Sequence, residues 1–221
     1  MTPNPHNHWR QGSEIRFAAT LILLFLIAQL ADQWIFHHFT FHTIYDRPWG
    51  RMLRLAGYFP LWGIVALALV LHDWVPRELS TLPRASRRGL LLFGSAALGG
   101  IIAELLKIVF RRERPGLTDG AHVIRSWSDQ PFSTARLGLP SSEVAVAFAA
   151  ATVLARLFPD AWLLWYALAV GCALTRVASG AHFMSDVLLA ALVGYVSALI
   201  VWPRGGLAGT QAAGSSGDAH A

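Results

Sequence analysis

The feature that most constrains the fold is a series of long apolar segments, because a bilayer core requires roughly 20 apolar residues for each spanning helix. A soluble domain carries about 25% charged residues, whereas this chain has 14% charged and 54% hydrophobic residues. Six segments approach the spanning length, at 17–39, 52–72, 89–110, 142–157, 161–177 and 183–202. The sequence therefore predicts an all-α, multi-pass integral membrane protein with six transmembrane helices.

The chain is expected to form one membrane domain with two flanking segments. Residues 1–16 are predicted to be an N-terminal cytoplasmic segment, 17–202 the membrane domain, and 203–221 a disordered tail rich in Gly, Ala and Ser. The first apolar segment exceeds the usual length of a signal peptide core and has no clear cleavage site after it, so we interpret it as an uncleaved anchor. The net charge of +5 indicates anionic lipid partners or topology signals rather than nucleic acid.

Basic residues are distributed unevenly over the two faces that this topology creates. With a cytoplasmic N-terminus, the positive-inside rule accounts for Arg77, Arg84, Arg87 and Arg88. The opposite face then carries a second set of cations: Lys107, Arg111, Arg112, Arg114, Arg125, Arg136 and Arg176. Either the orientation is reversed or these cations have another role. Many of them lie in or beside the connection 111–139, and loops longer than about 12–15 residues are usually functional or disordered.

Two short motifs on that face could bind an anion. Lys107 ends an apolar segment, and Arg114 precedes Pro115, which biases it towards a loop conformation. Two such cations can converge on one anion, although snorkelling of basic side chains to the interface is an alternative. Ser141 and Ser142 follow Pro140 where the next helix is expected to begin. Serines there cap a helix, and a helix N-terminus also attracts anions.

A third motif adds a potential nucleophile. His182 and Asp186 are four residues apart and therefore share one face of a helix. Asp186 could accept a hydrogen bond from one ring nitrogen and leave the other free as nucleophile or base. Gly180 permits a turn that brings Arg176 towards His182. A polar contact between helices is the alternative for each residue alone, but together the motifs supply what phosphoryl transfer through a covalent histidine requires.

The order and spacing of these motifs resemble the type 2 phosphatidic acid phosphatase superfamily, which also includes vanadium-dependent haloperoxidases. Lys107 to Pro115, Pro140-Ser141, and Arg176 to Asp186 carry the resemblance. It implies a six-helix membrane bundle in which His182 attacks phosphorus and Asp186 orients it, without a metal ion or other cofactor. It also implies that a group of side chains binds the phosphate: Lys107, Arg114, Ser141, Ser142 and Arg176.

The chain departs from the family pattern at one position. The family reads Pro-Ser-Gly-His, where the histidine protonates the leaving oxygen, and this chain reads Pro140-Ser141-Ser142-Glu143. Glu143 could itself be the acid, could only favour the helix dipole, or could reflect a leaving group that needs no proton. His122, in the long loop, could supply a substitute proton. A lipid diphosphate expels a weaker base than a lipid monoester does, so we favour a diphosphate donor such as an undecaprenyl-diphosphate-like lipid.

The expected function is that of an integral-membrane lipid phosphatase or phosphotransferase with a phosphohistidine intermediate, acting at the periplasmic face of a bacterial inner membrane. The alternative is a catalytically weak relative that binds or moves anionic lipids without chemistry, and a haloperoxidase ranks below both. Further polar residues are predicted to face the bundle interior or to form pairs: Gln29, Asp32, Gln33 and Glu104 with Lys107. His37, His38 and His42 are more typical of interfacial histidines than of metal ligands.

Overall fold

The computed structural model describes residues 5–41, 43–74 and 87–203. These residues form seven α-helices and three short 3-10 turns, with no β-strand in the same ranges. The helices are α1 (Pro5–Phe39), α2 (Pro48–Leu55), α3 (Phe59–Trp74), α5 (Arg87–Phe110), α6 (Ser142–Leu157), α7 (Trp162–Ala178) and α8 (Met184–Val201). The turns are η1 (Ile44–Asp46), η3 (Pro115–Leu117) and η4 (Pro159–Ala161).

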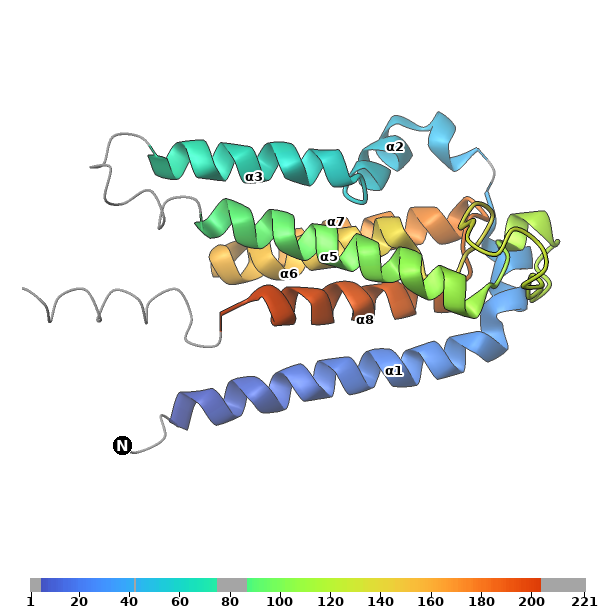
Figure 1. Ribbon diagram of the computed structural model, residues 1–221, viewed down its shortest axis with the longest axis horizontal. Coiled ribbons are helices and arrows are strands. Elements are labelled where there is room, and N and C mark those ends of the chain that lie inside the picture. Colours follow the sequence, from blue (N-terminus) through green and yellow to red (C-terminus); the bar gives the residue numbers. More distant parts are fainter. Residues whose placement is uncertain (1–4, 42, 75–86, 204–221) are drawn as a thin grey trace, which may run out of the picture.

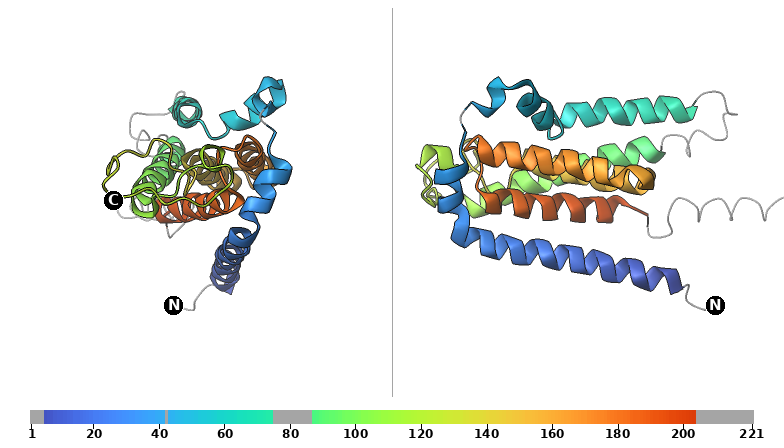
Figure 2. Two further views of the ribbon diagram at one scale, coloured as in Figure 1. Left: turned by 90° about the vertical axis from the view of Figure 1, so that its right-hand side faces the viewer. Right: turned by 180° about the vertical axis from the view of Figure 1, so that it is seen from behind.

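Helix α6 is the packing centre of the bundle, with α5, α7 and α8 around it (Figures 1 and 2). Every residue from Val144 to Leu154 is buried. The alanine-rich sequence explains this position, because small side chains let neighbouring helices approach closely. The contact with α8 is the tightest: a Cβ atom added at Gly194 would lie 2.3 Å from the carbonyl oxygen of Ala145.

The bundle has the surface of a membrane protein. Four helices, α1, α5, α7 with its preceding turn, and α8, are long and apolar enough to cross a bilayer, and the pair α2–α3, bent by 62°, would add a fifth span. Large apolar side chains such as Leu30 and Ile64 point outward, as lipid contact requires. The predicted all-α, multi-pass architecture is confirmed. The predicted count of six spans is not, since α6 has only 16 residues.

The second predicted span, 52–72, is interrupted. Helix α2 ends at Leu55 and α3 begins at Phe59. Pro60, in the first turn of α3, has no N–H group and cannot continue a helix from α2. The carbonyl oxygen of Ala56 at this corner accepts a hydrogen bond from the Trp62 indole N–H at 2.8 Å, which satisfies a group that the break leaves free. Residues 52–55 therefore belong to a separate short helix.

The division into flanking segments 1–16 and 203–221 and a membrane domain stays a prediction. Helix α1 begins at Pro5, so it includes most of the predicted segment 1–16. Of the predicted tail 203–221, residues 204–221 lie outside the described part of the chain, as do Arg77, Arg84 and His42.

The connection between α5 and α6 is an ordered loop built around two buried arginines. Arg111 ends α5 in a left-handed conformation with φ of 54°. Its guanidinium donates hydrogen bonds to the backbone carbonyls of residues 125, 126, 129 and 131 at 2.6–3.0 Å and lies over the Trp127 ring at 4.7 Å. Arg125 likewise donates to the carbonyl of Ala135 at 3.1 Å and to that of Ser133. These two members of the cation set fold the loop.

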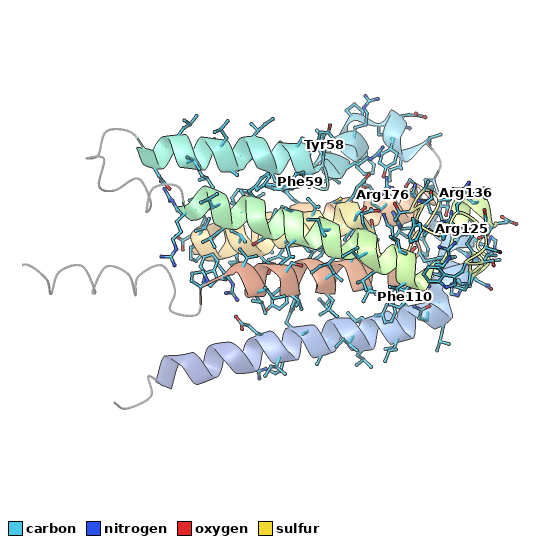
Figure 3. The ribbon with its side chains drawn as sticks, in the orientation of Figure 1. Tyr58, Phe59, Phe110, Arg125, Arg136 and Arg176 are labelled. Atoms are coloured by element: carbon cyan, nitrogen blue, oxygen red, sulfur yellow. The ribbon has the colours of Figure 1, made fainter. Side chains whose placement is uncertain are left out.

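This loop, the C-terminal end of α1 and helix α2 gather at one end of the bundle, with the beginnings of α6 and α8 close by (Figures 1 and 2). Figure 3 shows Arg125, Arg136 and Arg176 at the same end. The three sequence motifs therefore converge on one face of the bundle, as the topology predicted.

Candidate active site

His182 lies in the tight link between α7 and α8. Gly180, with φ of 69°, reverses the chain there, and the His182 amide donates to the carbonyl of Arg176 at 3.3 Å. The imidazole is 3% exposed, and its Nδ1 lies 2.9 Å from the carbonyl oxygen of Gly138. A carbonyl oxygen can only accept, so Nδ1 carries the proton. In the neutral ring, Nε2 then holds the lone pair of a nucleophile.

Asp186 supports this ring through its charge. It occupies the third position of α8, where its Oδ2 accepts a hydrogen bond from the Phe183 amide at 2.8 Å. The same oxygen lies 3.6 Å from His182 Nδ1, which is farther than the Gly138 carbonyl. The predicted hydrogen bond between the two side chains is thus replaced by a close electrostatic contact. Gly138 has to be a glycine, because a Cβ atom there would lie 2.9 Å from Asp186 Oδ2.

Burial controls the protonation of the imidazole. Desolvation lowers the pKa of His182 to about 4, although the nearby carboxylate of Asp186 opposes the shift. Arg176 and Arg114 contribute further to the lowering. Burial also lowers the pKa of Arg114, and the positive charge of Arg176 adds to this effect. At neutral pH the ring is therefore uncharged and able to act as a nucleophile.

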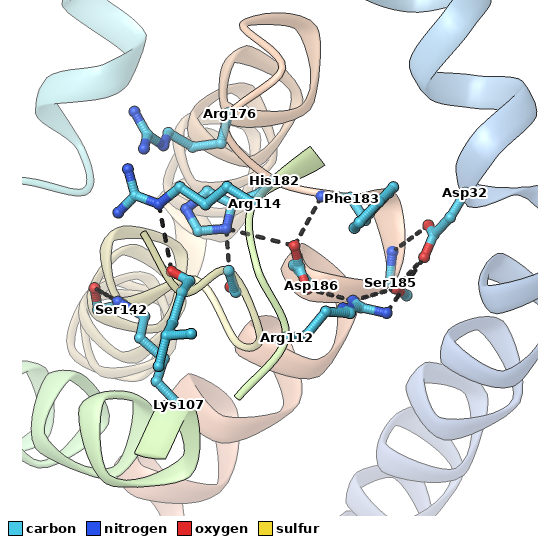
Figure 4. Close-up of polar contacts among 12 residues, drawn as sticks. Asp32, Lys107, Arg112, Arg114, Ser142, Arg176, His182, Phe183, Ser185 and Asp186 are labelled. Carbon is cyan, nitrogen blue, oxygen red and sulfur yellow. Dashed lines mark hydrogen bonds and ion pairs between the residues drawn. The ribbon is translucent and has the colours of Figure 1, made fainter. Parts of the chain in front are cut away.

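Three cations lie around the imidazole, two from the first motif and one from the third (Figure 4). Lys107, 3% exposed at the end of α5, donates to Glu104 at 2.6 Å and to Ser142 Oγ at 3.0 Å. The first of these contacts confirms the predicted Glu104–Lys107 pair. Arg114 precedes η3 and donates from Nε to the Leu137 carbonyl at 3.3 Å. Arg176, in the last turn of α7, is 4% exposed.

The beginning of α6 contributes hydroxyl groups to the same region. Ser141 is the N-cap residue of α6, fully buried, and its backbone N–H donates to the carbonyl of Asp186 at 3.3 Å. Its Oγ has no hydrogen-bond partner among the described residues, although buried hydroxyls nearly always have one. Ser142 is already engaged by Lys107. An anion among the three cations would give Ser141 its missing partner.

Glu143 is held between two arginines. Its Oε1 accepts a hydrogen bond from Arg54 Nη2 at 3.2 Å, and its Oε2 lies 3.2 Å from Arg176 Nε as an ion pair. Both carboxylate oxygens therefore face guanidinium groups, and Glu143 connects α6 to α2 and to α7. No motif indicated Arg54, which lies 89 residues earlier on α2.

A buried charge network behind Asp186 was also missed by the sequence analysis (Figure 4). Arg112 donates to Asp186 Oδ1, to Ser185 Oγ at 2.7 Å and to Gln29 Oε1 at 3.0 Å. Asp32 on α1, also predicted to face the interior, lies 3.7 Å from Arg112 and accepts the Ser185 amide at 2.9 Å. This network fixes the carboxylate that faces the imidazole.

His122 belongs to the far end of the same network. Its Nε2 lies 3.4 Å from Asp32, and its ring meets the Phe183 ring edge-on at 4.6 Å. The His122 Nε2 atom is therefore paired with Asp32, in the charge network that supports Asp186. The geometry gives no support to its hypothetical role as a substitute proton donor.

The comparisons with known proteins agree with this arrangement. The family model described as "PAP2 superfamily" matches residues 88–206. A lipid A 1-phosphatase from Rhizobium etli is 36% identical over 124 residues, which cover 54% of this chain and 52% of that protein. The lipid A 1-phosphatase of Rhizobium johnstonii is 35% identical over 124 residues, covering 54% of this chain and 50% of the relative. The chain thus matches about half the length of these curated relatives.

A solved structure shares the fold. The transmembrane PAP2-type phosphatidylglycerolphosphate phosphatase from Bacillus subtilis superimposes with a TM-score of 0.55 and 18% sequence identity, covering 92% of this chain and 98% of that one. The matched family region includes every residue of the three motifs. The chain belongs to the PAP2 superfamily.

Proposed function

We propose that the protein is an integral-membrane lipid phosphatase in which His182 carries the phosphoryl group as a phosphohistidine. One observation supports this above all: the Gly138 carbonyl holds the Nδ1 proton of a buried imidazole, so that Nε2 is the nucleophilic nitrogen. Cations and a buried hydroxyl without a partner lie beside it. The similarity to a lipid A 1-phosphatase over about half of the chain also supports this function.

In the proposed reaction, Nε2 of His182 attacks phosphorus, and the bond to the leaving oxygen breaks. Lys107, Arg114 and Arg176 stabilise the negative charge on the three equatorial oxygens, and Ser141 donates a hydrogen bond to one of them. The ring becomes positively charged as the bond forms, which Asp186 favours from 3.6 Å. Water then attacks the phosphohistidine and releases inorganic phosphate. Protein cations supply the charge stabilisation in this scheme, so it includes no metal ion.

A groove beside the site supports a lipid substrate. It has a volume of about 610 Å³, and apolar residues of α3, α5 and α6 line it, including Phe59, Ile101 and Val146. Its lining also includes polar side chains, those of Glu104, Ser142 and Glu143. An acyl or prenyl chain in this groove would leave its phosphate near the cations.

The substrate class follows from Glu143. Glu143 replaces the histidine of the family pattern, and its two oxygens are engaged by Arg54 and Arg176. We therefore propose a leaving group that needs no proton, and a lipid diphosphate provides one. The Glu143→His variant tests this argument by restoring the acid of the family pattern. We expect it to raise turnover of a lipid monoester relative to that of the diphosphate with the same chain. An unchanged ratio would show that the leaving group does not explain the substitution.

The activity itself is tested by phosphate release from a lipid panel in detergent. The panel contains an undecaprenyl diphosphate, phosphatidate, phosphatidylglycerophosphate and lipid A, each with wild type and His182→Ala. We expect release by the wild type from at least one lipid, abolished in the variant, with acid-labile phosphate trapped on wild-type protein only. Lipid binding without release in either protein would instead favour the non-catalytic alternative. Phosphate transfer to an added lipid alcohol would identify a phosphotransferase.

We also propose that the site faces the periplasm of a bacterial inner membrane, as the positive-inside rule implies for Arg87 and Arg88 at the opposite end of α5. The single native cysteine, Cys172, is buried, so an introduced thiol reports cleanly. Phe132 in the site-side loop is 83% exposed. Phe132→Cys should react with a membrane-impermeant maleimide in intact spheroplasts, and reaction only after lysis would reverse the orientation.

A further inference from the structure

Arg54 is a cation of the site face that no motif of the chain includes. It lies at the end of α2, and its side chain is 48% exposed. Its guanidinium lies over the Tyr45 ring at 5.0 Å and donates from Nη2 to Glu143 Oε1 at 3.2 Å. The Tyr45 hydroxyl in turn accepts from Arg176 Nη1 at 3.2 Å. Arg54 is thus joined to Arg176 by one carboxylate and one phenol.

The position of Arg54 is fixed by backbone packing. A Cβ atom at Gly57, directly after α2, would lie 2.8 Å from the carbonyl oxygen of Glu143 and 2.9 Å from Cys172 Sγ. One at Gly171 on α7 would lie 2.7 Å from the Leu53 side chain. These close approaches anchor α2 against α6 and α7. Arg54 is therefore presented to Glu143 by a rigid corner.

Glu143 connects Arg54 to the groove that we assign to the lipid. In a phosphoryl transfer, the nucleophile and the leaving oxygen lie roughly in line on opposite sides of phosphorus. With His182 as nucleophile, the lipid side of the substrate would therefore lie on the side of phosphorus away from the imidazole. Ser142 and Glu143 are among the residues that line the groove, and Glu143 accepts a hydrogen bond from Arg54.

We propose that Arg54 forms a cationic subsite for the phosphate of the leaving group, so that this chain stabilises the departing charge instead of protonating it. The proposal rests on the proposed function. A guanidinium has five N–H donors, and Arg54 uses Nη2 for Glu143, so it can bind a phosphate while keeping its carboxylate partner. Glu143 then serves to orient Arg54 and Arg176, which gives its presence at the acid position a physical reason.

The reaction step balances without a proton donor. Nε2 of His182 bonds to the terminal phosphorus of the lipid diphosphate, and the bond from that phosphorus to the bridging oxygen breaks. The electron pair stays on the bridging oxygen, which departs as part of an anionic lipid monophosphate next to Arg54. Water later hydrolyses the phosphohistidine, so the sum is lipid diphosphate plus water to lipid monophosphate plus inorganic phosphate.

The test compares two substrates that share one tail, undecaprenyl diphosphate and undecaprenyl phosphate, with purified full-length protein in detergent. The variants are Arg54→Gln, Arg54→Lys and the matched control Arg51→Gln, which changes an exposed arginine one turn earlier on α2. Loss of a group that stabilises developing charge lowers kcat by about 10²–10³-fold at buried sites. For the half-exposed Arg54 we expect about a tenfold loss of kcat/KM for the diphosphate, less than threefold for the monoester, and partial activity in Arg54→Lys.

A second comparison uses Glu143→His, which supplies a proton to the leaving group. The effect of Arg54→Gln on diphosphate turnover should shrink in that background. Equal losses for both lipids, or wild-type kinetics in a folded Arg54→Gln protein, would overturn the subsite. Wild-type protein that cleaves only monoesters would also overturn it and leave the lipid phosphatase function intact. No phosphate release from any lipid would refute the proposed function itself.

Discussion

Arg112 provides the sharpest test of how the site is built. The substitution Arg112→Met keeps most of the side-chain length and removes the guanidinium. It eliminates the hydrogen bonds to Ser185 and Gln29 and the ion pairs with Asp186 and Asp32. Both aspartates are fully buried, so the variant leaves two carboxylates of like charge in one protein interior without their shared cation.

The magnitude follows from this loss. Removal of one partner of a buried ion pair costs about 3–5 kcal/mol, because the charge left behind stays desolvated. We expect a destabilisation in this range for Arg112→Met. The double variant with Asp32→Asn should be more stable than the sum of the two single effects by about 0.5–3 kcal/mol, as expected for residues that share one network. The coupling arises because the second change removes one of the unpaired charges.

The assay is reversible denaturation in mixed micelles, followed by circular dichroism, for the four proteins of this cycle. Arg136→Met is the matched control: Arg136 lies in the same loop, its side chain is 59% exposed, and its contact with Glu113 is 3.9 Å. Such a surface pair contributes about 0–1 kcal/mol. Additive effects of Arg112→Met and Asp32→Asn, or equal stabilities of Arg112→Met and Arg136→Met, would refute the network as the support of Asp186.

Three further predictions concern pH, packing and the serine pair. Because burial lowers the pKa of His182 to about 4, the imidazole stays neutral as the pH falls through 6.5. We therefore expect kcat/KM, corrected for substrate ionisation measured by ³¹P NMR, to fall only near pH 4 on the acid side. A fall of kcat/KM near pH 6.5 would contradict this. Gly57→Ala should destabilise the protein by about 1–3 kcal/mol in the same denaturation assay, because the added methyl group would clash with the backbone of α6. Gly63→Ala should be tolerated, because the nearest atom to its added Cβ would lie 4.0 Å away. Ser142→Gly removes the 3.0 Å hydrogen bond from Lys107 and should raise KM for phosphate-bearing lipids severalfold. Initial rates measured over a range of lipid concentrations would detect this change.

The helical segments were largely predictable, because their signal is local. Apolar runs in the sequence match α5, α6, α7 and α8 to within a few residues. The break between α2 and α3 was missed, because the apolar run continues through Gly57 and the proline that forbids a continuous helix lies three residues later. The close approach of Gly57 to Glu143 of α6 at this corner is a further feature that no local pattern indicates.

The candidate site, like the fold, was predictable only where its residues lie in local motifs. His182, Asp186 and the three cations lie in motifs with fixed spacing, so the sequence could indicate them. Arg112 and Arg54 could not be distinguished from other basic residues of that face, since their roles depend on partners 74 and 89 residues away. Several cations of that face turned out to have different roles: Arg111 and Arg125 fold the loop, and Arg112 holds Asp186.

The contact between Asp32 and Ser185 has a consequence for biogenesis. These residues are 153 positions apart, so the acidic side chain enters the membrane on α1 long before α8 is synthesised. Helix α1 has a mean hydropathy of 1.8, so it is apolar enough to insert into the membrane while it carries Asp32. Arg112 can pair with Asp32 once α5 has been made, but the hydrogen bond from the Ser185 amide forms only after α8 has docked. Assembly of the candidate site is therefore completed only after α8 has been synthesised, and nascent chains that lack α8 are expected to lack the phosphatase activity that we propose.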